Sequence, residues 1–229
     1  MTTPSGNLIL DDEYMTVRSI SVSDMDNNVY LLTSKTTGQQ VLIDAADNAP
    51  AIREFISTSA DEDFTGDGAA AGLSAIFTTH GHWDHIRALK EIAEEFDVAT
   101  FAGDDDLQAI EEQENFTVDT GVNGTEIFHF EDFSLETISL VGHTPGSIAL
   151  VLRDIDEMHP TLIFTGDSLF PGGVGKTNSP EDFESLFEDV KTKIFDEFDD
   201  DTVVLPGHGN CTTLGADRGN LSEWKKRGW

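Results

Sequence analysis

The sequence predicts a single α/β domain, in which many strands alternate with a few helices. Short apolar runs rich in β-branched and aromatic residues recur along the chain, with turn residues between them. Several segments repeat their apolar residues at helical spacing, and no linker or break in composition divides the 229 residues. Such a pattern suits two sheets covered by helices, although periodicity alone does not establish that arrangement.

Strands are expected wherever a short apolar run is bounded by turn residues. In the first half of the chain these runs cover residues 17–22, 28–34, 39–47 and 73–79. In the second half they cover residues 97–102, a meander over 117–140, and the runs 147–153, 161–166 and 201–206.

Helices are expected at four places between these strands: residues 48–58, 86–96, 104–112 and the segment that begins at 180. The last has Ser179 as its N-cap and Pro180 at its first helical position. The Gly-, Ala- and Asp-rich stretch 58–74 has no periodicity and predicts a surface loop. The basic tail 223–229 is expected to be solvated.

The composition is strongly acidic, with 44 Asp and Glu against 13 Lys and Arg and a formal charge of −31. Such a surface keeps the protein in solution and repels nucleic acid and anionic membranes, so neither is expected as a partner. Cys211 is the only cysteine, which excludes an intramolecular disulfide and a cysteine-based zinc site. No secretory signal and no membrane-length apolar run is present, so a cytoplasmic location is expected.

The stretch TTHGHWDH, residues 78–85, concentrates three histidines and one aspartate. At this chain's own His and Asp frequencies, the pattern HxHxDH has a chance on the order of one in a thousand. Three further candidates follow later apolar strands, each beside glycine: His143, Asp167 and His208. Because ligands gather where strand ends open into loops, these side chains are expected to converge.

The candidate metal ligands are therefore five histidines and two aspartates: His80, His82, Asp84, His85, His143, Asp167 and His208. Neutral imidazoles suit zinc or iron, and a carboxylate can bridge two cations. Seven ligands are too many for one tetrahedral ion but fit two ions about 3.5–4 Å apart. A structural zinc site is usually closed and rich in cysteine, so a catalytic site is favoured. His129 and His159 lack such company and are assigned to packing.

The motifs THGHWDH, GHTPGS, TGDSLFPGGVGKT and PGHG occur in an order that resembles the metallo-β-lactamase superfamily. Within it, the chain is similar to hydroxyacylglutathione hydrolases (glyoxalase II) and their single-domain relatives, from about residue 28 to 217. The resemblance implies an αββα four-layer sandwich with two metals at one edge of the paired sheets. Full-length glyoxalase II also has a C-terminal helical domain. The chain ends 21 residues after His208, so we expect one domain over 1–229 without it.

The resemblance also implies a role for each candidate residue. The first metal would take His80, His82 and His143, and the second would take Asp84, His85 and His208, with Asp167 as the bridge. Asp44 matches a position that supports the ligands from behind. Lys176 matches a lysine that helps to hold a carboxylate of the thiol carrier. Because the helical domain is not expected, the identity of that carrier stays open.

The expected reaction is hydrolysis of a small-molecule thioester by a metal-bridging hydroxide. Two cations lower the pKa of a shared water from near 16 to about 7 and polarise the carbonyl that it attacks. Asp84 and Asp167 would be the catalytic carboxylates that orient this nucleophile. A thiol ionises near pH 8.5, so the thiolate leaves without a general acid. Zinc is expected, with iron or manganese compatible with the same ligands.

Other functions share parts of this pattern. A mononuclear iron persulfide dioxygenase would use only two histidines and one aspartate, and a lactone hydrolase would use the same fold. A non-catalytic binding member would show eroded ligands, whereas all seven are present. The stretch 170–177 is no phosphate-binding loop, because Phe170 occupies the position of the required glycine. Trp83 and Phe170 are candidates for the substrate pocket, and the oligomeric state is not indicated.

Overall fold

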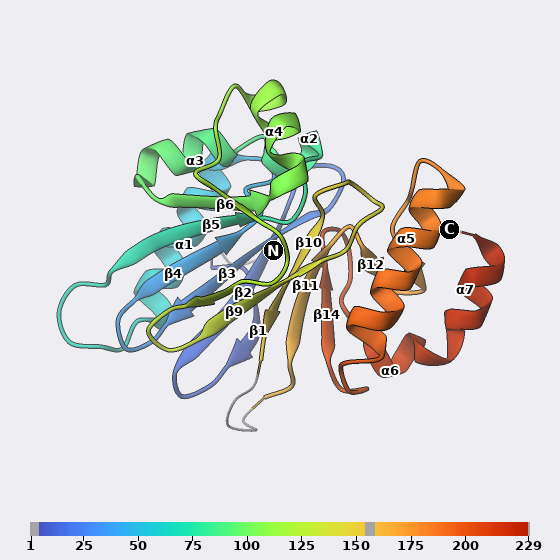
Figure 1. Ribbon diagram of the computed structural model, residues 1–229. Coiled ribbons are helices and arrows are strands. Elements are labelled where there is room, and N and C mark those ends of the chain that lie inside the picture. The colour runs from blue at the N-terminus through green and yellow to red at the C-terminus, as the bar shows by residue number, and fades with distance from the viewer. Residues whose placement is uncertain (1–4, 154–158, 229) are drawn as a thin grey trace.

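A computed structural model describes residues 5–153 and 159–228 and arranges them in four layers (Figure 1). Two β-sheets face each other, and a group of helices covers the outer face of each sheet. The predicted αββα sandwich is thereby confirmed. The organisation of residues 1–229 as a single domain stays a prediction, since residues 1–4, 154–158 and 229 lie outside the described part.

The first sheet is built from the N-terminal half of the chain. Its strands lie in chain order: β1 (Asn7–Asp11), β2 (Met15–Val22), β3 (Asn27–Ser34), β4 (Gln39–Ile43), β5 (Gly72–Thr78), β6 (Ala99–Gly103) and β7 (Thr120–Val122). Strands β1 to β4 pair antiparallel, and β4 to β7 pair parallel. The carboxyl ends of β4, β5 and β6 therefore reach one edge of the sheet.

The second sheet comes from the C-terminal half. Its order is β15 (Thr212–Thr213), β14 (Val203–Pro206), β11 (Leu162–Gly166), β10 (Ile148–Leu152), β9 (Ser134–Ser139) and β8 (Ile127–His129). Strands β11 and β14 are parallel and the other pairs are antiparallel. A short hairpin, β12 (Leu169–Phe170) and β13 (Gly173–Val174), follows β11.

The helices divide between the two outer faces. The first sheet carries α1 (Ala49–Asp63), α2 (Trp83–Ile86), α3 (Leu89–Phe96) and α4 (Leu107–Glu114), with a 3₁₀ turn at Asp104–Asp106 before α4. The second carries α5 (Pro180–Asp189), α6 (Leu214–Asp217) and α7 (Leu221–Arg227), with a π turn at Val190–Phe195 and a 3₁₀ turn at Arg218–Asn220. The predicted Ser179 cap is confirmed, because its hydroxyl accepts the Asp182 N–H at 3.0 Å.

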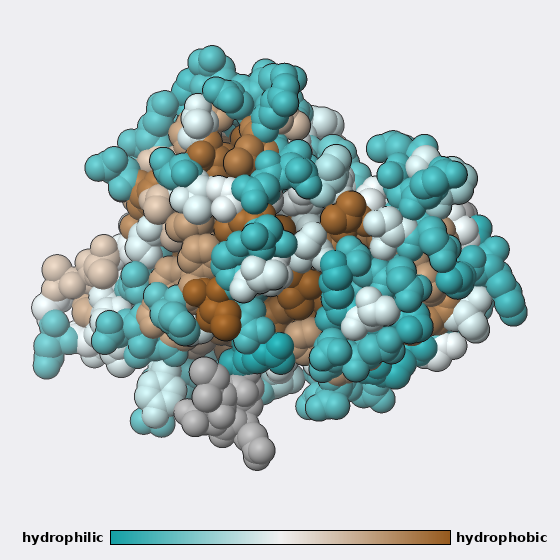
Figure 2. All heavy atoms as spheres, viewed as in Figure 1, coloured by the Kyte–Doolittle hydropathy of each residue, from teal (hydrophilic) through white to brown (hydrophobic). Residues whose placement is uncertain are grey.

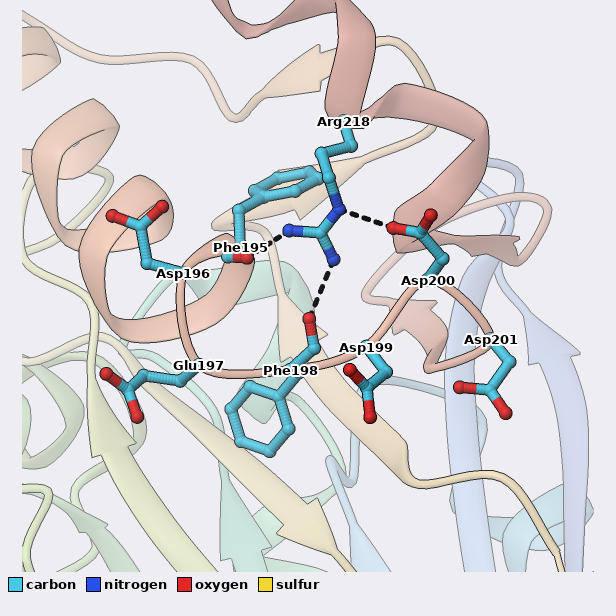
Figure 3. Close-up of a pocket in the computed structure, with 8 residues that line it drawn as sticks. All are labelled: Phe195, Asp196, Glu197, Phe198, Asp199, Asp200, Asp201 and Arg218. Carbon is cyan, nitrogen blue, oxygen red and sulfur yellow. Dashed lines mark hydrogen bonds and ion pairs between the residues drawn. The ribbon is translucent and has the colours of Figure 1, made fainter.

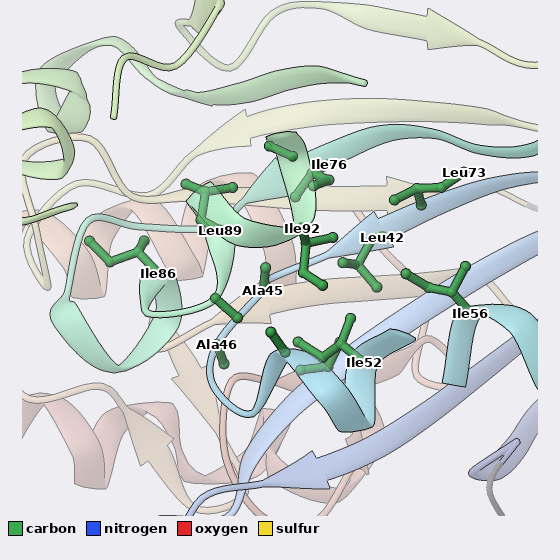
Figure 4. Close-up of a cluster of buried hydrophobic side chains, with 14 of the residues drawn as sticks. Leu42, Ala45, Ala46, Ile52, Ile56, Leu73, Ile76, Ile86, Leu89 and Ile92 are labelled. Carbon is green, nitrogen blue, oxygen red and sulfur yellow. The ribbon is translucent and has the colours of Figure 1, made fainter. Parts of the chain in front are cut away.

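Three apolar clusters correspond to the three interfaces between layers. Figure 4 shows the first, where Ile52 and Ile56 of α1 and Leu89 and Ile92 of α3 pack on Leu42 of the first sheet. A second cluster lies between the sheets, and a third lies under α5 to α7. The viewed face in Figure 2 is mostly hydrophilic. Among the described residues, no helix has the length and apolarity to cross a membrane.

Two helix predictions were wrong in extent. Helix α1 continues to Asp63, through part of the stretch 58–74 that was predicted to be a loop. Asp63 is buried, and its two carboxylate oxygens accept hydrogen bonds of 2.7 Å from Nε and Nη2 of Arg18. This long-range contact fixes the last turn of α1. The predicted helix 86–96 is divided into α2 and α3. The division falls where the Ala88 N–H donates to the carbonyl of Ala45 at 3.0 Å.

The C-terminal tail is not simply solvated. Residues 221–227 form α7, which buries Trp224 against Phe195. Trp229, the last residue of the predicted tail, lies outside the described residues. Lys225 pairs with Glu184 of α5 at 2.9 Å, and Arg227 donates to the carbonyl of Gly172 at 3.0 Å. Strand β1 and the hairpin of β12 and β13 were also missed, because each is short and bears few β-branched residues.

Candidate metal centre

All seven predicted ligands lie together at the edge where four strands end. Residues 80–85 follow β5 of the first sheet and run into α2. His143, Asp167 and His208 follow β9, β11 and β14 of the second sheet. A backbone bridge between Asn27 and His208 joins the two sheets at this point. The loops of both halves are thereby brought to one place.

Three histidines form the first group of potential ligand atoms: His80, His82 and His143. Their nearest ring nitrogens lie within 4.8 Å of one another, and their ring centroids are 4.5–4.9 Å apart. Three imidazoles this close without a hydrogen bond between them are typical of a shared cation.

The second group consists of Asp84, His85 and His208. His85 Nε2 lies 3.1 Å from His208 Nε2, and His208 Nε2 lies 3.3 Å from Asp84 Oδ2. Two ligand atoms of one tetrahedral zinc ion are separated by roughly 3.4 Å, given bond lengths of about 2.1 Å. The spacing of the second group therefore suits a small divalent cation.

Asp167 lies between the two groups. Its Oδ1 is 3.5 Å from His85 Nε2, and its Oδ2 is 3.6 Å from His143 Nε2 and 3.4 Å from His208 Nε2. Each carboxylate oxygen thus faces histidines, and the carboxylate as a whole reaches both groups. This is the placement that a bridging ligand requires.

The histidines are held through one ring nitrogen while the other faces the centre. The Nδ1 atoms lie 2.9 Å from Asp44 Oδ2 for His85, 2.7 Å from the carbonyl of Lys176 for His143, and 2.8 Å from the carbonyl of Met25 for His208. Such outer contacts fix the tautomer in which Nε2 is free to bind a metal.

Three buried polar atoms at this centre find no hydrogen-bond partner in the described part of the chain: His80 Nε2, His143 Nε2 and Asp167 Oδ1. Buried polar atoms without a partner are costly, so a cluster of them facing one point indicates a missing partner. Two imidazole nitrogens and a carboxylate oxygen are suitable ligands for zinc or iron. The residues present therefore fit a metal.

In the metal-free centre, the pKa values of a first-group histidine, a second-group histidine and Asp167 shift in different directions. Burial and the neighbouring histidines hold the pKa of His80 well below its usual value, so this ring is neutral and able to ligate. Burial alone would lower the pKa of His208, but its hydrogen bond with Asp167 and the nearby charges raise that pKa to about 9. Burial would raise the pKa of Asp167, yet the same hydrogen bond and three histidines lower it.

Asp44 and Lys176 lie at the back and at the rim of the centre. Asp44 is buried and accepts the Thr79 N–H at 2.7 Å and the Thr79 hydroxyl at 2.8 Å, besides its contact with His85. The backbone of Lys176 supports His143, while its side chain is exposed. A cavity of about 220 Å³, bordered by His143, Asn178 and Asp182, opens beside the first group.

Two residues that contact the centre were not expected. Asn27 is fully buried, and its Nδ2 donates to Asp84 Oδ2 at 3.1 Å and to the Asp84 carbonyl at 3.0 Å. Asp106 is buried between the loops that carry the first group. Asn27 begins a strand and Asp106 ends a run of three aspartates, so neither had a sequence signal of its own.

The other histidines lie elsewhere, and Trp83 lies between His82 and Asp84 with its side chain largely exposed. His129 contacts Ser134, and His159 lies near Asp12, both away from the centre. Trp83 is 47% exposed, and the Arg87 guanidinium lies 3.8 Å from the centre of its ring. A larger cavity of about 740 Å³ contains none of the seven ligands; there Arg218 binds Asp200 and two backbone carbonyls (Figure 3).

Comparison with known proteins gives four relevant likenesses. A family model described as the metallo-beta-lactamase superfamily matches residues 22–208. The hydroxyacylglutathione hydrolase GloC of Haemophilus influenzae is 32% identical over 161 residues, which cover 64% of this chain and 73% of that protein. ETHE1 from Myxococcus xanthus has a TM-score of 0.72 at 22% identity, covering 92% of this chain and 84% of its own. TTHA1623, solved in a di-iron-bound form, has a TM-score of 0.65 at 24% identity, covering 87% and 96%.

Proposed function

The chain belongs to the metallo-β-lactamase superfamily, and we propose that it is a dinuclear metal hydrolase that cleaves the thioester of a small thiol. The observation that carries the proposal is the pair of ligand groups that share Asp167 at one sheet edge. The similarity to a hydroxyacylglutathione hydrolase supports the substrate class. Two divalent ions would occupy the centre, with zinc proposed first and iron or manganese compatible with the same ligands.

In this proposal His80, His82 and His143 hold one ion, Asp84, His85 and His208 hold the other, and Asp167 is shared. Bound divalent cations would supply a hydroxide nucleophile at neutral pH and polarise the carbonyl of the substrate. Asp84 and Asp167 face the same point and stay available as hydrogen-bond acceptors, so they can orient the attacking water. Because a thiolate is a good leaving group near neutral pH, the chain needs no separate general acid.

Lys176 supports a substrate that carries an anionic group. Eleven of the 13 basic residues form an ion pair or donate a hydrogen bond within the described residues. Lys176 and Lys226 do neither with any residue that the structure describes, although the chain has 44 acidic side chains. Since its backbone holds His143 and its ammonium has no partner among the described residues, Lys176 is the cation that we propose to contact a carboxylate of the thiol carrier.

The test is elemental analysis of the purified protein, followed by assay against a panel of acyl thioesters. We expect two metals per chain and hydrolysis of a small-thiol thioester, with Asp84→Ala losing one metal equivalent and most of the activity. Lys176→Ala should raise KM for a carboxylate-bearing thioester and leave KM for a neutral one unchanged, with Lys226→Ala as the matched control.

Three outcomes would contradict the proposal. Two metals per chain without thioester cleavage would refute the reaction, and turnover of a lactone instead would assign a lactone hydrolase. One iron per chain with oxygen consumption on a persulfide would assign the mononuclear dioxygenase. Full activity of Asp84→Ala would show that the dinuclear mechanism is wrong.

A further inference from the structure

A buried carboxylate, Asp106, joins the two loops that carry the first group of histidines. It lies in the 3₁₀ turn before α4, is 2% exposed, and is no ligand itself. Its Oδ2 accepts the Gly81 N–H at 2.7 Å and the Thr144 hydroxyl at 2.6 Å. Its Oδ1 accepts the Gly146 N–H at 2.8 Å.

The positions of these partners relative to the ligands are informative. Gly81 is the residue between His80 and His82, and Thr144 is the residue directly after His143. One carboxylate therefore binds the middle of the first ligand loop and the start of the second, although the two loops belong to different sheets. Gly81 is also held on its other side, where its carbonyl accepts Gln113 Nε2 at 2.8 Å.

Three glycines allow this close approach. A Cβ atom at Gly146 would lie 2.4 Å from the backbone nitrogen of Asp106, and one at Gly81 would lie 3.2 Å from its Cβ. Gly103, three residues before Asp106, would place a Cβ only 1.9 Å from the carbonyl oxygen of Gly146. The packing thus accepts no larger residue at Gly146 or Gly103 without movement of the backbone.

The second ligand group has separate supports. Asp84 is held by Asn27, His85 by Asp44, and His208 by the carbonyl of Met25. Asp106 is hydrogen-bonded to residues next to the first group alone. A change at Asp106 should therefore affect one group of ligands and spare the other.

We propose that Asp106 is a positioning residue for the metal bound by His80, His82 and His143. It sets the distance between the histidine pair of the first sheet and the single histidine of the second. This inference rests on the proposed function. Orientation of ligands by hydrogen bonds from behind typically changes metal affinity by about 10–100-fold.

The experiment is titration of the metal-free protein with Co²⁺, which reports each bound equivalent through its visible absorption. His82→Ala and Asp84→Ala identify the equivalents that belong to the first and second groups. Asp106→Asn keeps the shape of the side chain, but its amide N–H₂ must then face at least one of the buried N–H or O–H groups that donate to the carboxylate. Asp105→Asn, the same change at an exposed neighbour in the same turn, is the matched control.

We expect Asp106→Asn to weaken the first equivalent by about 10–100-fold, with an altered absorption band, and to leave the second within about twofold. Asp105→Asn should bind both equivalents as the unchanged protein does. Thr144→Val, which removes a single hydrogen bond, should weaken the first equivalent to a smaller degree.

Unchanged binding in Asp106→Asn, or equal weakening of both equivalents, would overturn the proposal. If circular dichroism shows that Asp106→Asn does not fold, Thr144→Val decides, and unaltered Co²⁺ binding in that variant overturns it. Failure of the proposed function is distinct: it would appear as absent thioester cleavage or an absent second equivalent in the unchanged protein.

Discussion

Replacement of Asp44 by asparagine should lower the metal affinity strongly and the stability of the fold only slightly, and so should distinguish its effect on His85 from its effect on the fold. Asp44 has a φ of 59°, a left-handed conformation that Asn tolerates as well as Asp does. In Asp44→Asn the amide oxygen can still accept the Thr79 N–H. The amide N–H₂ then faces His85 Nδ1, to which it can donate but from which it cannot accept. The favoured tautomer of His85 changes, so its Nε2 carries a proton where a metal would bind.

The magnitude follows from the two contacts of Asp44 Oδ2, because the amide N–H₂ that replaces this oxygen can accept neither from His85 Nδ1 nor from the Thr79 hydroxyl. The fold loses two buried, charge-assisted hydrogen bonds, of 2.9 Å with His85 and 2.8 Å with the Thr79 hydroxyl, each worth about 1.5–3 kcal/mol. The amide recovers most of this by donating to the His85 ring and to the Thr79 oxygen. We expect the second metal equivalent to bind about 10–100-fold more weakly, with a loss of about 1–2 kcal/mol in the unfolding free energy of the metal-free protein. Asp44→Ala removes all three bonds and forces alanine into the same φ, so it should cost roughly 3–5 kcal/mol.

The assay combines Zn²⁺ competition against a chromophoric chelator with urea denaturation of the metal-free protein. Asp47→Asn is the matched control, since it makes the same change three residues away, at a side chain that pairs with Arg87 on the surface. If Asp44→Asn binds the second equivalent as tightly as the control does, the tautomer argument is wrong. If both variants lose stability equally, Asp44 has no special role.

Three further predictions concern pH and salt. Burial opposes ionisation of Glu126, but the N–H groups of residues 123–125 and the Thr137 hydroxyl lower its pKa from 4.5 to about 2. Its ionised form therefore stabilises the fold above about pH 4.5. After allowance for its partial exposure, Glu126→Gln should lower the unfolding free energy by about 1–2 kcal/mol at pH 7, and this difference should vanish as the pH falls towards 2. A difference that stays constant over this pH range in urea denaturation would contradict the assignment. Because His208 has a pKa of about 9 in the metal-free protein, metal binding at pH 7.5 should release protons, and the affinity should rise with pH. Calorimetry in two buffers of different ionisation enthalpy measures the proton release, and binding heats that do not depend on the buffer would contradict this prediction. Raising the salt concentration from about 0.01 M to about 1 M shortens the screening length from about 30 Å to about 3 Å and so weakens the repulsion between the acidic side chains. The Tm of this chain, whose net charge is −31, should therefore increase. A constant or falling Tm would mean that this repulsion does not limit stability.

The sequence was informative wherever a local signal coincided with the tertiary structure. Candidate ligands such as His143 and His208 follow an apolar strand and lie beside glycine, and both properties are visible within a few residues. The cap at Ser179 and most strands of both sheets were predicted on the same basis. The αββα arrangement itself came from the family resemblance, because alternating strands and helices are compatible with several layer orders.

The rest depends on partners that are distant in sequence. Helix α1 reaches Asp63 because Arg18 lies under its last turn, and α2 separates from α3 because Ala45 accepts the Ala88 N–H. Asp106 is one of three consecutive aspartates, and only burial between Gly81 and Gly146 distinguishes it from its neighbours. Two of the three donors to Asp106 are backbone N–H groups, which leave no mark on the sequence.

Each group of candidate ligands draws on both halves of the sandwich: His80, His82, Asp84 and His85 follow a strand of the first sheet, and His143 and His208 follow strands of the second. Neither half alone contains a complete site, so the ligands assemble only when the two sheets have docked. A bound ion would then connect the two halves of the sandwich and stabilise the docked state by RT ln(1 + [metal]/Kd). Removal of metal should therefore loosen this edge of the sandwich before the opposite edge. Loss of metal and separation of the sheets would then be linked events during thermal inactivation.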